Sequence, residues 1–268
     1  MEKESSQWLI PILLAVSAAG ALWYYWISVE KPVSVPAVEA PAPVPVEPQA
    51  MPEPLHPLPE PDMGATERPE LVPLPALDQS DDYFKLALTD LFGESLEEML
   101  VSSGIIERIV ATVDNMPRAH VAERVRPLGP LAGQFIVDGQ DGSGEFMISD
   151  TNYDRYDLLV GFLSGADLGQ IADVYRRFYP LFQDAYVDLG YPNGYFNDRL
   201  IEVIDDLLAT PDTNEPVSLV RPHVLYEYSD PDLESLSSGQ KMLLRMGSEH
   251  RSNVKQKLRE FRNIATQM

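Results

Sequence analysis

The stretch LGQIADVYRRFYPLFQDAYVDLGYPNGYFNDRLIEVIDDLLA, residues 168–209, sets the fold class. Between Leu168 and Leu189, apolar side chains recur every three or four residues, which is the pattern of a helix with one buried face. Pro180 removes a backbone donor inside this helix, and we expect a kink there. The turn sequence GYPNG, residues 190–194, ends the helix, and a second apolar stripe predicts another helix over residues 196–209.

The flanking sequence extends the helical pattern in both directions. Helical periodicity predicts a helix from residue 81, a second apolar stripe up to residue 113, and short helices around 121–125 and 153–163. Toward the C-terminus it predicts helices over 232–246 and 251–267.

One stretch departs from the helical period. The sequence GQFIVDGQDGSGEFMIS has apolar runs at Phe135–Val137 and Phe146–Ile148 around a turn rich in Gly and Asp, which predicts a β-hairpin. A further apolar run, 224–228, predicts an isolated strand. We therefore expect a mainly α domain over residues 78–268, with about seven or eight helices and one small β-hairpin.

Residues 8–29, WLIPILLAVSAAGALWYYWISV, form an uncharged run of 22 residues. As a helix the run spans roughly 33 Å, enough to cross a hydrocarbon core of about 30 Å. Ala19-Gly20-Ala21 offers a signal-peptide cleavage site, but the apolar LWYYWI after it favours a retained anchor. We predict a short tail over residues 1–7 and a single-pass transmembrane helix over residues 8–29, with the domain outside the cytoplasm.

A proline-rich tract follows the predicted anchor. There are 14 prolines among the 46 residues from Pro32 to Leu77. Proline fixes φ and removes a backbone donor, so such a tract does not form a packed core. We predict a disordered tether over residues 30–77. It could be a spacer that holds the domain away from the bilayer or a linker with no length requirement.

Acidic residues outnumber basic ones, and the net charge is −22. This charge argues against binding to nucleic acid or to anionic lipid, because phosphates would be repelled. The last 29 residues have the opposite sign, with seven basic and two acidic residues. The predicted C-terminal helix therefore folds back onto the acidic body or binds an external anion. Its basic residues are Lys255, Lys257, Arg259 and Arg262.

Asp198, Glu202 and Asp205 share one face of the predicted helix over residues 196–209, at positions i, i+4 and i+7. Three readings stay open: a solvated face, a docking face for the basic C-terminal helix, and a metal or acid–base site. No histidine lies at a spacing that would complete a metal site with these acids.

Tyrosine and arginine are concentrated in the middle of the domain. Both residue types are favoured at protein interfaces, although tyrosine is also common in helical cores. We weigh a core role against a partner surface. The candidate surface residues are Tyr153, Tyr156, Arg176, Tyr179, Tyr191 and Tyr195.

The sequence holds no P-loop, no G-x-G-x-x-G and no G-x-S-x-G motif, and it has no cysteine. Thiol catalysis and thiolate metal sites are therefore excluded. We assign no catalytic residue, no cofactor and no metal ligand beyond the three acidic candidates.

Four runs together resemble a bacterial family known as domain of unknown function 3014. They are NYDRYDLLVGFL, VYRRFYPLFQDAYVDLGYPNGYFNDRLIEVIDDLLATP, VLYEYSDPDLESLSSGQKMLLRMG and KQKLREFR. The resemblance covers most of residues 80–265 and implies a common fold, together with an N-terminal membrane helix and a proline-rich spacer. It implies no activity. Members often place His after the IEVID run, where this chain has Asp206.

These observations favour a non-enzymatic interaction or scaffold protein of the bacterial cell envelope. We expect it in the inner membrane, with its domain in the periplasm. The expected partners are the lipid bilayer, through residues 8–29, and another envelope protein or a cell-wall component. The alternative is a hydrolase or metal-dependent enzyme that uses the acidic helix face of residues 198–206.

Overall fold

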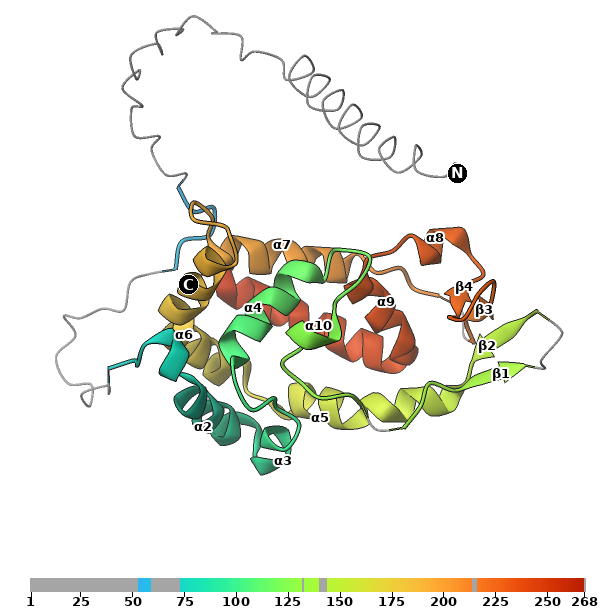
Figure 1. Ribbon diagram of the computed structural model, residues 1–268, viewed down its shortest axis with the longest axis horizontal. Helices are drawn as coiled ribbons and strands as arrows, with labels where there is room; N and C mark the ends of the chain where they lie inside the picture. Colours follow the sequence, from blue (N-terminus) through green and yellow to red (C-terminus); the bar gives the residue numbers. More distant parts are fainter. Residues whose placement is uncertain (1–52, 59–72, 132, 140–143, 214–215, 268) are drawn as a thin grey trace, which may run out of the picture. The chain divides into compact units, whose positions relative to one another are not determined.

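The computed structural model describes residues 53–58, 73–131, 133–139, 144–213 and 216–267. Helices make up most of this structure, and a small sheet lies at the opposite end of the domain from the C-terminus (Figure 1). Three short 3-10 helices connect the larger elements: η1 (Leu77–Gln79), η2 (Glu123–Val125) and η3 (Asp150–Tyr156).

The domain begins with α2 (Asp81–Phe92), α3 (Glu94–Glu97) and α4 (Ile105–Asn115). Gly93 separates α2 from α3 with a φ of +81°, a left-handed conformation that favours glycine. In the first turn of α2, the Asp81 carboxylate accepts hydrogen bonds from the backbone N–H groups of Gly104 and Ile105, both at 2.9 Å. Asp81 therefore satisfies two amides at the start of α4.

The predicted helix–turn–helix stretch forms α6 (Leu168–Asp188) and α7 (Phe196–Leu208), preceded by α5 (Asp157–Gly165). Asp167 caps α6, because its side chain accepts from the N–H groups of Gly169 and Gln170. Helix α6 continues through Pro180.

The chain closes with α8 (Pro231–Glu234), α9 (Ser238–Arg245) and α10 (Gly247–Ala265). Ser237 and Gln240 form a capping box at the start of α9, in which each side chain bonds the backbone N–H of the other. Helix α10 packs against α5, α6, α7 and α9, so it is a central element of the domain.

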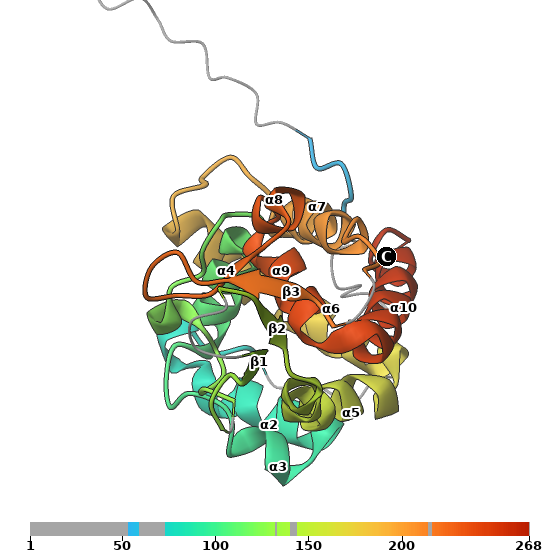
Figure 2. The same ribbon diagram turned by 90° about the vertical axis from the view of Figure 1, so that its right-hand side faces the viewer.

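The four strands of the described residues form one antiparallel sheet in the order β1-β2-β3-β4 (Figure 1), and Figure 2 shows β1, β2 and β3. They are β1 (Val137–Gly139), β2 (Phe146–Ile148), β3 (Ser218–Val220) and β4 (Glu227–Tyr228). Strands β1 and β2 are the predicted hairpin. Strand β3 lies in a stretch for which the sequence predicted no helix or strand, and β4 lies in the run predicted as an isolated strand.

The core consists of three apolar clusters. The main cluster joins α2, α4, α6 and α7, and its residues Ile105, Ile106 and Val110 on α4 are completely shielded from solvent. A second cluster lies against the sheet and includes Phe146. A third lies between α5, α7 and α9 and includes Tyr156.

The fold class predicted from the sequence was wrong in two respects. The described residues form nine α-helices rather than seven or eight, and a four-stranded sheet rather than one hairpin. The additional elements have only two to four residues, so they are too short to show a periodicity. No helix within the described part of the chain is long and apolar enough to span a membrane. The predicted anchor, residues 8–29, lies outside that part.

Two pieces of the predicted tether also differ from the prediction. Leu58, Leu74 and Leu77 pack against the main core cluster, so residues 53–58 and 73–77 are part of the folded unit. The rest of residues 30–77 lies outside the described residues.

Candidate functional site

The first turn of α7 is fixed by aromatic packing. The buried ring of Phe196 stacks on Phe182 of α6, with 5.5 Å between the ring centroids. The next residue, Asn197, is fully buried, and Asp198 is half-buried. These two polar side chains therefore have defined positions at the start of the helix, where a carboxylate also interacts favourably with the helix dipole.

Residues 53–58 (EPLHPL) lie against this turn (Figures 1 and 2). Their side chains alternate between exposed and half-buried positions, and Pro54, His56 and Leu58 are on the half-buried side. A bend at Leu55 and His56 directs two consecutive backbone N–H groups toward the Asp198 carboxylate, at 3.0 and 2.7 Å. Without such a bend, consecutive N–H groups of an extended chain point in opposite directions.

Asn197 makes a third bond to the same segment. Its Nδ2 donates to the carbonyl oxygen of His56 at 2.8 Å and to that of Ala265 at 3.5 Å. Its Oδ1 accepts from the Tyr175 hydroxyl at 3.1 Å. We use the name α7 docking site for Asn197, Asp198 and the core surface that Leu58 covers. All three bonds to residues 55–56 go to backbone atoms.

The negative charge of Asp198 raises the pKa of two tyrosines on α6. Burial raises the pKa of Tyr175 well above its ordinary value, and the charges of Tyr179 and Asp198 add to that effect. The pKa of Tyr179 is raised to about 12, chiefly by burial. A hydrogen bond with the backbone of Asn197 lowers this pKa, whereas the charges of Asp198 and Tyr195 raise it further. Both hydroxyls are therefore protonated near neutral pH and available as hydrogen-bond donors.

The three acids predicted as a possible site do not act together. Asp198 holds residues 55–56, Glu202 pairs with Arg199 at 2.7 Å, and Asp205 pairs with Arg262. Within the described residues, no group of three or more His, Asp or Glu side chains is placed to hold a metal ion. The neighbouring Asp206 accepts a hydrogen bond from the Ser237 hydroxyl and so helps to fix the start of α9.

The basic residues of α10 point to several different partners. Arg262 makes two bonds to the Asp205 carboxylate, and this guanidinium lowers the pKa of Asp205 although partial burial opposes the shift. Lys255 is buried and donates to the Thr210 carbonyl oxygen at 2.7 Å. Lys257 is half-buried and Arg259 is exposed. Docking of the basic helix onto the acidic face, one of the three readings that the sequence left open, is thus present at Arg262.

The tyrosines and the arginine predicted as a partner surface lie on several elements. Tyr156 is buried in the third cluster, and Tyr153 packs against the second. Arg176 pairs with Asp173 on α6. Only Tyr179 and Tyr195 lie near Asn197 and Asp198. The sixth residue, Tyr191, belongs to a different polar cluster.

That cluster is centred on Asp114, a buried acid at the end of α4 that the sequence did not single out. Its carboxylate pairs with Arg118 at 2.7 Å and Arg199 at 3.1 Å, and it accepts from the Tyr191 hydroxyl at 3.3 Å. Arg199 also donates to the Asp114 carbonyl oxygen. These bonds connect α4 to α7 and to the turn before α7, which supports the position of the docking site.

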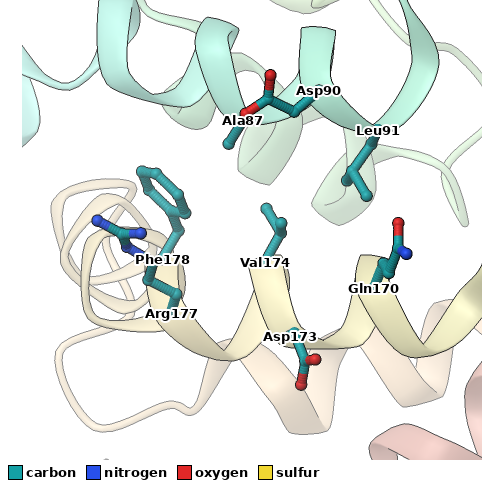
Figure 3. A pocket seen from close by; sticks show the side chains of 8 residues that line it. All are labelled: Ala87, Asp90, Leu91, Gln170, Asp173, Val174, Arg177 and Phe178. Carbon is teal, nitrogen blue, oxygen red and sulfur yellow. The ribbon is translucent and has the colours of Figure 1, made fainter. Parts of the chain in front are cut away.

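A separate pocket of about 310 Å³ lies between α2 and α6 (Figure 3). The side chains of Leu91 and Val174 point into it, whereas the Asp173 carboxylate points away. Arg177 on its rim lies over the Phe178 ring, with 5.8 Å from the guanidinium carbon to the ring centroid. The walls therefore combine apolar and polar side chains, four of each. The lining residues are Ala87, Asp90, Leu91, Gln170, Asp173, Val174, Arg177 and Phe178.

Comparison with known proteins identifies a family. The family model described as "Protein of unknown function (DUF3014)" matches residues 105–262, which is more than half of the chain. The chain therefore belongs to this family, as the resemblance of its sequence predicted. No curated protein and no solved structure matches it. The matched region includes the α7 docking site, and the docked segment lies outside that region.

Proposed function

We propose that this member of the DUF3014 family is a non-enzymatic interaction protein whose helical domain binds a segment of another polypeptide. The supporting observation is the α7 docking site, where Asp198 and Asn197 hold residues 55–56 by three hydrogen bonds. Hydrogen bonds from a domain to the backbone of a short segment are a feature of peptide-recognition sites, which supports the proposal.

The chemistry of these bonds supports recognition of a chain rather than of one side chain. Backbone N–H and C=O groups are common to all residues except for the missing donor of proline, so many sequences can make the same three bonds. The Leu58 contact adds a requirement for an apolar residue two positions after His56. Affinity would come from the backbone bonds and selectivity from the apolar contact.

The three acids of the enzyme alternative do not form one shared site. Asp198, Glu202 and Asp205 have three different bonding partners, and two of these partners are arginines on α7 and α10. The cell-envelope location and the lipid partner stay predictions, because they depend on residues outside those that the structure describes. Separation of soluble and membrane fractions from cells that express the full chain would test them.

Photo-cross-linking in the expressing bacterium tests the proposed function. A photoreactive amino acid replaces Tyr195, which is half-buried and lies two residues before Asn197. The matched control replaces Met147, which is exposed on the sheet at the other end of the domain (Figure 1). We expect a cross-link to another polypeptide from position 195 that weakens with Asp198→Ala and is absent from position 147. Equal cross-linking from both positions, or none from position 195, would contradict the proposal.

A further inference from the structure

The α7 docking site requires groups from a polypeptide chain to complete its hydrogen bonds. Asn197 is fully buried, and its Nδ2 group donates a hydrogen bond of 2.8 Å to the His56 carbonyl oxygen. A buried amide without an acceptor costs about 1–3 kcal/mol. Asp198 in turn accepts from two consecutive amides. A carbonyl and two adjacent N–H groups therefore have to be supplied together, and a chain segment with a bend like that at Leu55 and His56 supplies them.

The segment that supplies these groups lies at the start of the folded unit, ahead of its helices in the chain. The described part of the domain resumes at residue 73, and 14 residues connect it to Leu58. Leu55, whose N–H bonds Asp198, has a side chain that is 80% exposed. The segment is thus held by three backbone bonds and the half-buried side of a few residues, so its release would not expose the centre of the core.

The sequence of the segment is suited to a ligand that binds without a large loss of entropy. Pro54 and Pro57 flank the two residues whose N–H groups bond Asp198. Proline restricts φ before binding, which reduces the conformational freedom that binding removes. Leu58 follows Pro57 directly and places an apolar side chain on the core.

We propose that residues 53–58 are an internal ligand that occupies the α7 docking site and is displaced by a proline-containing segment of another protein that adopts the same bend. This inference rests on the proposed function and adds the class of ligand and its regulation. The external segment has two consecutive residues other than proline, then a proline and an apolar residue. A covalently attached competitor acts at an effective concentration on the order of millimolar for a short linker, so the internal ligand raises the threshold for partner binding.

The test uses the full chain and a fluorescent peptide of residues 51–60 (MPEPLHPLPE) as the probe. In one variant, Leu55→Pro and His56→Pro remove the two amide donors and Leu58→Asp removes the apolar contact, which empties the site. We expect this variant to bind the peptide at least about tenfold more tightly than the wild-type chain, because the internal competitor is gone. Adding Asp198→Ala to the variant reverses the gain, whereas adding Glu202→Ala, on the same helix, does not. A peptide with Leu58→Asp does not bind.

The result that would overturn the inference is equal peptide binding by the variant and the wild-type chain, or binding that is insensitive to Asp198→Ala. If the variant fails to fold, hydrogen exchange on the wild-type chain replaces it. Excess unlabelled peptide then speeds exchange at the amides of Leu55 and His56, and unchanged exchange contradicts the inference. A wild-type dimer in light scattering that the variant lacks also contradicts it, since a second copy would then supply the segment.

The outcome separates this inference from the proposed function. Peptide binding in solution without a cellular cross-link at position 195 would support the displaceable ligand and contradict the interaction role. A cross-link at position 195 without peptide binding would support the interaction role and contradict the displaceable ligand. The partner would then use a different surface feature near Tyr195.

Discussion

Asp81 and Asp198 use the same chemistry in two regions of the molecule. Each carboxylate accepts hydrogen bonds from two consecutive backbone amides, Gly104 and Ile105 in the first case and Leu55 and His56 in the second. The chain that Asp81 holds continues into α4, whose residue Ile105 is completely buried. The chain that Asp198 holds has Leu55 in an exposed position. Identical bonds can therefore stabilise a core or dock a peripheral segment.

The largest effect is expected at Asp81. We predict that Asp81→Ala lowers the free energy of unfolding by about 1–3 kcal/mol, because two amides at the start of α4 lose a charged acceptor. Asp82→Ala is the matched control, since Asp82 is an exposed acid in the same first turn of α2. Urea unfolding followed by circular dichroism measures both variants. Equal losses would mean that the helix dipole, rather than the bonds to α4, accounts for the role of Asp81.

Alkaline pH sharpens the comparison, because tyrosines of α6 lie near Asp198. The pKa of Tyr179 is raised to about 12 by burial and, in part, by the Asp198 charge. In the unfolded chain a tyrosine loses its proton near its ordinary pKa of 10.0, so between these values the folded state binds more protons. The raised pKa of Tyr179 therefore contributes to the stability of the folded state below pH 10. This contribution is lost as the pH rises from 10 through about 12.

The Asp198 charge contributes to the position of that titration. We predict that Asp198→Ala shifts the phenolate titration, followed by ultraviolet absorbance, to lower pH. Asp81→Ala leaves the titration of Tyr179 unchanged while the protein is folded. A titration that does not respond to Asp198→Ala would contradict a contribution of the Asp198 charge to the pKa of Tyr179.

The smallest effect is expected at the ion pair next to the docking site. Arg262 lowers the pKa of Asp205 below its ordinary value of 3.8, so the pair stabilises the folded state above that pH. The contribution is lost as the pH falls through the lowered pKa. We predict that Arg262→Gln is less stable than the wild-type protein near neutral pH and that the difference shrinks in acid. Arg259→Gln, which changes an exposed residue of the same helix, is the control.

The sequence predicted the helices well where apolar stripes are long. The stripe that includes Tyr175, Phe178 and Phe182 defines α6, and all three side chains are buried. Pro180, where the sequence predicts a kink, lies inside α6, which continues on both sides of it. The sheet could not be predicted in full, because Ser218–Val220 is too short for alternation to be visible and pairs with a strand about 70 residues earlier.

The docking site shows a different limit of sequence reasoning. The face with Asp198, Glu202 and Asp205 was identified, and its contact with the basic C-terminal helix was one of the open readings. The sequence did not predict that residues 53–58 contact the domain, because the prolines favoured a disordered tether. The distribution of leucine was a second signal. Leucine is absent from residues 30–54 and then occurs at positions 55, 58, 71, 74 and 77. Three of these leucines pack on the core, so the change in apolar composition marked the start of the folded unit.

Hydrogen exchange at the amides of Leu55 and His56 in the full chain tests the central claim most directly. The account predicts that both amides are protected in the wild-type protein and in Glu202→Ala, and that Asp198→Ala removes this protection while the amides of Gly104 and Ile105, held by Asp81, stay protected. Fast exchange at residues 55–56 in the wild-type protein, or protection that survives Asp198→Ala, would contradict the claim that Asp198 holds this segment on the domain.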